Sequence, residues 1–106
     1  MVPASDEKAY YFSFYVSTMT SAAERSIDLL YEICDQYLKG EYKVEVINLS
    51  ESPEQGIKDQ ILATPTLIKK KPGPVKRVVG NLVNKEKILE ALELDIKDKN
   101  IHKKVK

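Results

Sequence analysis

Few residues in this chain of 106 could carry out catalysis by nucleophilic, acid–base or metal chemistry. The one cysteine, Cys34, could act as a nucleophile or a redox thiol, and the one histidine, His102, could act as an acid, a base or a metal ligand. A single cysteine cannot form an internal disulfide, and a single histidine lacks the second member of a two-histidine metal site. The composition therefore argues against disulfide exchange and against catalysis based on histidine.

Three carboxylates fall within a segment whose other residues predict a helix. Asp28, Glu32 and Asp35 are separated by four and three residues, so a helix would place them on one face. Such a face could hold a cation, but a solvated face opposite an apolar stripe is the more common arrangement. We therefore expect no metal and no other cofactor.

A basic stretch around a proline-rich segment is the remaining candidate for function. It comprises Lys69, Lys70, Lys71, Lys76 and Arg77. Lysines on an edge hairpin discourage aggregation between sheet edges, whereas exposed Lys and Arg can also steer an acidic partner to a docking surface. Both interpretations remain open. Nucleic-acid binding is not expected, because 17 Lys and Arg residues are balanced by 16 Asp and Glu residues.

The elements that must position these residues follow from hydrophobic periodicity. Residues 10–16 alternate between two sides and predict a strand. Ser21 and Glu24 have the spacing of a capping box, so a helix is predicted over 21–39, with Cys34 as a small buried residue on its apolar stripe. The other predicted elements are a strand at 42–49, a short helix that starts after Ser52 and is interrupted at Gly56, an antiparallel hairpin of strands 66–70 and 75–79, and a last helix that begins at Asn84.

The order strand, helix, strand, helix, strand, strand, helix is that of a thioredoxin-like α/β fold, a mixed sheet with helices on both faces. We expect one domain over 1–106, ordered from about 8 to 96, with a frayed polar tail at 97–106. Thioredoxin-like enzymes carry reactive thiols at the first strand-to-helix turn, and that turn, residues 17–21, has none. No signal peptide or run of about 18 apolar residues occurs, so a soluble cytoplasmic protein without a membrane partner is expected.

Several segments of the chain resemble the KaiB family of circadian clock proteins. They are FYVSTMTSAAERSIDLL, KGEYKVEVINLSESPE, ILATPTL, KKPGPVKRVVGNL and NKEKILEAL. The resemblance covers nearly the whole chain from Lys8 to Leu94. It implies a non-enzymatic adaptor that binds a hexameric KaiC-type ATPase in clock or stress-adaptation signalling, with a KaiA-like protein or a histidine kinase as further partners. It also implies a dimer or tetramer, and a metamorphic switch between the thioredoxin-like fold and a second, ground-state fold.

The resemblance also assigns roles to individual positions. The residues that it places at the partner surface are Arg25, Lys43, Glu45, Lys76 and Arg77. The residues that it links to fold switching are Pro65, which it implies to be preceded by a cis peptide bond, Pro72, Pro74 and Ala91. Glu45 and Ala91 stand where the family has lysine and glycine. Because alanine is more favourable than glycine inside a helix by about 1 kcal/mol, we expect Ala91 to favour the thioredoxin-like fold.

Two other functions remain open. The chain could be a thioredoxin-like sensor or interaction domain with a different partner, similar to the domain at the start of the clock-associated kinase SasA. It could also be a thioredoxin-like oxidoreductase, which the single cysteine disfavours.

Overall fold

Four strands form one mixed sheet in the order β2-β1-β3-β4. In this computed structural model, which describes residues 8–92, the elements are β1 (Tyr10–Val16), α1 (Ser21–Leu38), β2 (Tyr42–Asn48), α2 (Pro53–Lys58), β3 (Thr66–Lys71), β4 (Lys76–Val79) and α3 (Lys85–Leu92). β1 runs parallel to β2 and antiparallel to β3, which is antiparallel to β4. This order confirms the predicted thioredoxin-like arrangement; the predicted tail and His102 lie outside the described residues.

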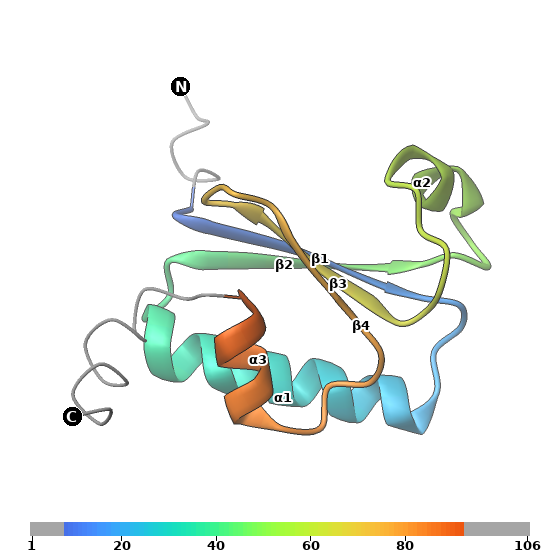
Figure 1. Cartoon of the computed structure of the whole chain (residues 1–106). Helices are drawn as coiled ribbons and strands as arrows, with labels where there is room; N and C mark the ends of the chain where they lie inside the picture. The colour runs from blue at the N-terminus through green and yellow to red at the C-terminus, as the bar shows by residue number, and fades with distance from the viewer. Residues whose placement is uncertain (1–7, 93–106) are drawn as a thin grey trace.

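The alternation of β1 divides the core into two clusters. α1 and α3 lie together on one face of the sheet, whereas α2 lies on the other side, near the ends of β1 and β2 (Figure 1). Phe12, Phe14 and Val16 pack on the face of α1 and α3. Tyr15 points to the opposite side and packs with Ile47 and Ile68. The predicted alternation of β1 is thus confirmed, and it gives both faces an apolar anchor.

α1 begins at Ser21 as predicted, but its cap is one residue earlier than the predicted Ser21. Thr20, in extended backbone conformation, caps the helix, and its Oγ1 accepts a hydrogen bond of 3.1 Å from the amide of Ala23. Ser21 is therefore the first helical residue and not the cap, because the hydroxyl one position earlier satisfies the free amide. At the other end, Lys39 adopts a left-handed conformation and Gly40 follows with φ +84°, so the helix ends at Leu38.

Gly56 lies inside α2 and does not interrupt it, contrary to the prediction. The helix packs closely over Leu49, and a Cβ atom at Gly56 would lie 2.9 Å from Cδ2 of that side chain. A glycine thus lets this short helix lie against the end of β2. Ser52 stands at the predicted cap position, but its side chain makes no capping hydrogen bond.

Candidate partner-binding surface

One face of the sheet is not covered by α1 and α3, and we call it the open face. Its side chains are Tyr11, Ser13, Tyr15, Lys43, Glu45, Ile47, Ile68, Lys70, Arg77 and Val79. The strand register sets these residues in rows: Ser13 lies opposite Glu45 on β2 and opposite Ile68 on β3. Ser13, Tyr15, Ile47 and Ile68 are buried. The exposed residues of this face, which a partner could contact, are Lys43, Glu45, Arg77 and Val79.

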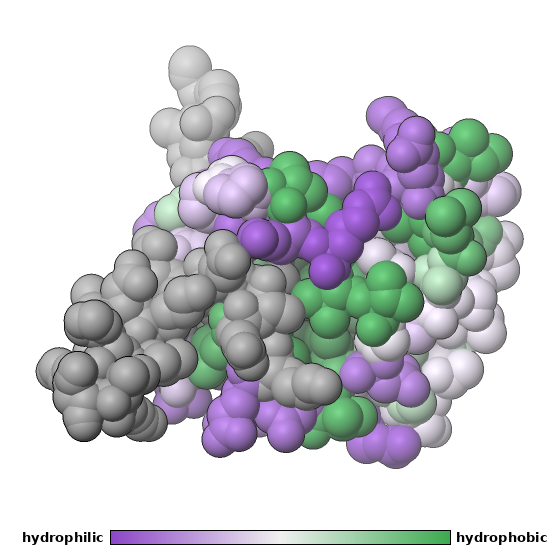
Figure 2. Space-filling model, in the orientation of Figure 1, coloured by the Kyte–Doolittle hydropathy of each residue, from purple (hydrophilic) through white to green (hydrophobic). Residues whose placement is uncertain are grey.

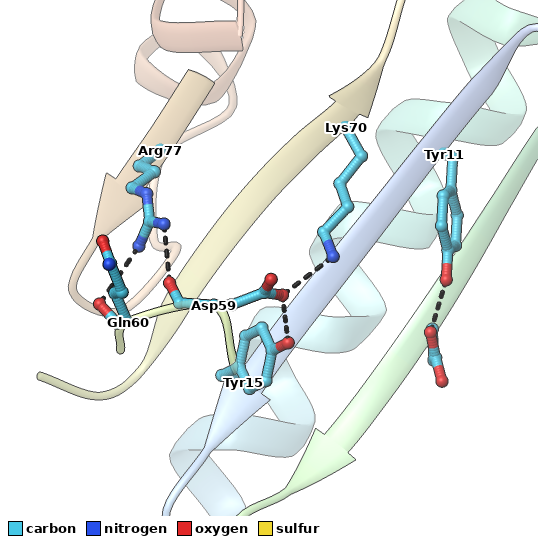
Figure 3. Close-up of polar contacts among 7 residues, drawn as sticks. Tyr11, Tyr15, Asp59, Gln60, Lys70 and Arg77 are labelled. Atoms are coloured by element: carbon cyan, nitrogen blue, oxygen red, sulfur yellow. Dashed lines mark hydrogen bonds and ion pairs between the residues drawn. The ribbon is translucent and has the colours of Figure 1, made fainter. Parts of the chain in front are cut away.

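A cluster centred on Asp59 joins the segment after α2 to the open face (Figure 3). The Asp59 carboxylate accepts hydrogen bonds from the Tyr15 hydroxyl and from the Lys70 ammonium group, the latter at 2.8 Å. The guanidinium of Arg77 donates to the main-chain carbonyl of Asp59 at 2.6 Å and to that of Gln60 at 3.5 Å. Contacts from β1, β3 and β4 thus meet at one short segment.

The ionisation of this cluster follows from its contacts. Burial alone would raise the pKa of Asp59, but hydrogen bonds from Lys70 and Tyr15, with the charges of Lys70 and Arg77, outweigh burial and hold it below its ordinary value. Burial, together with the hydrogen bond to the Asp59 carboxylate, raises the pKa of Tyr15 well above its ordinary value. At neutral pH the cluster therefore combines a carboxylate, two cations and a neutral tyrosine.

A second polar group of the open face lies on β1 and β2. The hydroxyl of Tyr11 donates to Oε1 of Glu45, and Nζ of Lys43 lies 6.0 Å from the centre of the Tyr11 ring. The hydrogen bond to Glu45, with burial, raises the pKa of Tyr11. Tyr11 thus contacts two charged residues of β2, Glu45 through its hydroxyl and Lys43 through its ring.

The first strand-to-helix turn offers no redox chemistry. Residues 17–20 of this turn are exposed, and the turn contains no thiol. Cys34 is fully buried on α1, as predicted, and burial, with the nearby charge of Asp35, raises the pKa of its thiol to about 12. A protonated, inaccessible thiol is a poor nucleophile.

The carboxylates Asp28, Glu32 and Asp35 of α1 are exposed, in agreement with a solvated helix face. Two of them have partners that the sequence did not indicate. Glu32 pairs with Lys85 of α3 at 3.3 Å, and Asp35 accepts a hydrogen bond of 2.5 Å from Tyr42. Within residues 8–92, no three His, Cys, Asp or Glu side chains come together as a metal site.

The KaiB domain model matches residues 13–94. The circadian clock oscillator protein KaiB of Prochlorococcus marinus (strain MIT 9211) is 40% identical over 90 residues, which cover 85% of this chain and 79% of that relative. The protein of the same name from Thermostichus vulcanus is 40% identical over 87 residues, covering 82% of this chain and 81% of the relative. The chain belongs to the KaiB family. The relatives are named as oscillator proteins and not as enzymes, in agreement with the predicted non-enzymatic role.

Solved structures similar to this KaiB-family chain show its fold. The N-terminal domain of Synechococcus elongatus SasA superposes with a TM-score of 0.66 at 17% identity, covering 78% of each chain. Mitochondrial thioredoxin 3 from Saccharomyces cerevisiae gives a TM-score of 0.63 at 15% identity, covering 82% of this chain and 79% of the thioredoxin. Both likenesses confirm the thioredoxin-like fold class.

The residues that the KaiB resemblance assigns to the partner surface do not form one patch. Lys43, Glu45 and Arg77 lie on the open face, but β2 and β4 are opposite edges of the sheet. Lys76 alternates with Arg77 and so points to the side of α1 and α3. Arg25 is exposed on α1.

The basic stretch is also less exposed than the sequence suggested. Lys69 pairs with Phe12 in the sheet and is only 3% exposed, and its Nζ donates to the carbonyl oxygens of Pro72 and Pro74. Lys69 is therefore a structural residue of the hairpin, because the carbonyl groups of the turn that it supports accept hydrogen bonds from its buried ammonium group and stabilise its charge. Among the lysines of this stretch, all of which the structure describes, Lys71 is exposed and Lys70 and Lys76 are half-buried.

The residues linked to fold switching lie in three places: before β3, in the turn between β3 and β4, and in α3. The peptide bonds before Pro65, Pro72 and Pro74 are all cis. Ala91 lies in the last turn of α3.

Across residues 8–92, no helix is long and apolar enough to cross a membrane.

Sequence reasoning missed an apolar groove of about 570 Å³ beside α2. Its large hydrophobic side chains that are exposed are Ile57 and Leu62, at 78% and 96% exposure. Figure 2 shows hydrophobic surface at the end of the molecule where α2 lies. The apolar pair Ile61-Leu62, outside any predicted element, was the available signal. Ile61 packs inward with Tyr15, whereas Leu62 does not.

Proposed function

We propose that this KaiB-family chain is a non-enzymatic cytoplasmic adaptor that binds a KaiC-type hexameric ATPase in clock or stress-adaptation signalling. A KaiA-like protein or a histidine kinase would be a further partner. The observation that carries the proposal is the KaiB match over residues 13–94. The thioredoxin-like fold without a thiol at its first turn supports a binding role.

We assign the contact with the ATPase to Arg25, Lys43, Glu45, Lys76 and Arg77. Arg25 and Lys43 are exposed, so their charges can reach an acidic partner surface. Arg77 has a second task, because it holds the carbonyl oxygens of Asp59 and Gln60. Its substitution would alter folding as well as binding. The cleanest test of the interface therefore uses Arg25 and Lys43.

The test is size-exclusion chromatography of the full chain mixed with the KaiC-type ATPase of the same organism and ATP. We expect the two proteins to co-elute, and we expect the Arg25→Ala/Lys43→Ala double variant to lose most of the complex. Lys39→Ala/Lys58→Ala, which removes the same charge from two exposed positions elsewhere, should co-elute like the unmodified chain. Absence of co-elution of the unmodified chain after a day would refute the adaptor proposal.

A second candidate function rests on the likeness to the SasA N-terminal domain. In this case the chain is a sensor or interaction domain with a partner other than the ATPase. Failure to co-elute with the ATPase, combined with capture of a histidine kinase from the same organism, would favour this candidate. An insulin-reduction assay distinguishes both from an oxidoreductase, and we expect no turnover because the one described thiol, Cys34, is buried.

Fold switching and self-association belong to the same proposal. Ala91 lies inside α3, where alanine stabilises the helix more than glycine would. This supports the proposal that the thioredoxin-like form dominates in solution. Backbone NMR spectra should show this form as the major species, and a spectrum of the ground-state fold alone would contradict it. Light scattering coupled to size exclusion would establish whether the chain forms a dimer or a tetramer.

A further inference from the structure

A pocket of about 210 Å³ opens at the end of the sheet where β1 and β2 begin and β3 ends. It is lined by Lys8, Tyr10, Tyr11, Lys43 and Lys71. The strand register explains why these residues meet, because Tyr11 lies opposite Lys43 on β2 and opposite Lys71 on β3. Lys43 and Lys71 thus approach Tyr11 from the two neighbouring strands, the pairing with β3 lying at a register shift between Tyr11 and Phe12, and Lys8 joins them from the segment that leads into β1.

The charge of this pocket is one-sided. Of the five described residues that line it, three are lysines and none is acidic. In the part of the chain that the structure describes, no carboxylate pairs with Lys8, Lys43 or Lys71, whereas Lys70 and Lys85 each have an acidic partner. Two acids lie two residues from Lys43: Glu41, which is exposed just before β2, and Glu45, whose Oε1 is engaged by the Tyr11 hydroxyl.

The positions of the lysines restrict the ligand. Their ammonium groups are point charges on flexible stems, which suit a compact anion with charge on several oxygens. A volume of about 210 Å³ equals that of roughly seven water molecules in the liquid, enough for one or two linked phosphate groups.

We propose that this pocket binds a compact phosphate anion, inorganic phosphate or diphosphate, between Lys43 and Lys71. The site does not depend on the proposed adaptor function, since it is formed within one chain. The attraction between an anion and the three lysines increases with the charge of the anion. A diphosphate or phosphate ion carries more negative charge than a carboxylate, so it is attracted more strongly. The order of affinity is therefore diphosphate, then phosphate, then acetate.

The test is a titration of the full ¹⁵N-labelled chain with sodium diphosphate, phosphate and acetate at equal, low ionic strength. We expect saturable shifts at the amides of Tyr11, Lys43 and Lys71 with diphosphate, smaller ones with phosphate and none of this pattern with acetate. An arm with ADP identifies the source of the phosphate: affinity equal to that of diphosphate means that only the phosphates are bound, and higher affinity adds a nucleoside contact.

Two double variants separate the pocket from the general charge of the protein. Lys43→Gln/Lys71→Gln should weaken diphosphate binding by about tenfold or more, because each lost charge contact removes a several-fold factor. Lys39→Gln/Lys58→Gln, at exposed positions away from the pocket, should change it by less than about twofold. Thermal unfolding confirms that both variants are folded.

Two results would overturn the proposal. One is the absence of saturable shifts at the pocket amides with diphosphate up to about 20 mM, a concentration at which even a weak site with millimolar Kd is filled. The other is equal loss of binding in the two double variants. Both readouts use the isolated chain, so they are independent of the ATPase experiment.

Discussion

Removal of the Asp59 carboxylate should destabilise the fold, because that group connects the segment after α2 to two strands. Asp59→Ala takes away the acceptor for the Tyr15 hydroxyl and the partner of Lys70. The backbone contacts remain, since the Asp59 amide donates to the Gln55 carbonyl and Arg77 binds the Asp59 carbonyl. The substitution therefore tests the side chain alone.

The size of the effect follows from burial. Tyr15 is 1% exposed, and a hydrogen bond from such a group to a charged acceptor contributes about 1.5–3 kcal/mol. The side chains of Lys70 and Asp59 are 33% and 21% exposed, so solvent screens their ion pair to about 0.5–1 kcal/mol. We expect Asp59→Ala to lower the free energy of unfolding by about 2–4 kcal/mol, a large part of the usual 5–15 kcal/mol.

Urea unfolding followed by circular dichroism measures this free energy. The matched control is Glu51→Ala, an exposed acid outside the cluster, which should cost less than about 0.5 kcal/mol. A double-mutant cycle with Tyr15→Phe should give a coupling of about 1 kcal/mol or more between the hydroxyl and the carboxylate. A cost for Asp59→Ala as small as that of the control, or no coupling, would refute the reasoning.

Four further predictions concern the pH dependence of the Asp59 cluster and three other positions. Because the folded pKa of Asp59 is depressed below an unfolded value of about 3.9, its stabilisation is complete above about pH 5 and is lost as the pH falls through the folded pKa; urea unfolding at several pH values should show a flatter acid limb for Asp59→Asn. Ser26→Ala should cost about 1–3 kcal/mol, because the buried Leu82 amide loses the acceptor that it binds at 3.0 Å; an unfolding free energy unchanged within error would contradict this. The Cys34 thiol should react with a disulfide reagent only as fast as the chain unfolds, since it is fully buried; rapid labelling in native buffer would show otherwise. Ala91→Gly should destabilise α3 by about 1 kcal/mol, seen as faster amide hydrogen exchange confined to that helix.

The sequence predicted the order of elements because most of their signals are local. The alternation of β1 and the apolar stripe of α1 are periodic over several turns or residue pairs, and such patterns survive in the folded chain. Burial of Cys34 followed from the same stripe. The cap of α1 was placed one residue late, because Thr20 and Ser21 are both competent caps and only the backbone conformation distinguishes them.

The polar contacts of the open face could not be predicted in this way. Tyr15 and Asp59 are 44 residues apart in sequence, and Tyr11 and Glu45 are 34 apart. Their meeting depends on strand register, which no local pattern specifies. Lys69 shows the same limit, because a run of lysines reads as a solvated stretch until the cis-proline turn of the hairpin is seen to supply carbonyl acceptors to one of them.

The positions of the family-assigned residues restrict how a partner can bind. Lys43 and Arg77 occupy strands at opposite edges of the sheet, with β1 and β3 between them. Arg25 and Lys76 lie on the side of α1 and α3. One flat partner surface cannot cover both sides of a sheet, so binding through all of these residues requires either two partners or one partner that wraps around an edge. Single substitutions distinguish the two arrangements: a shared partner loses affinity with either Arg25→Ala or Lys43→Ala, whereas separate partners each respond to one.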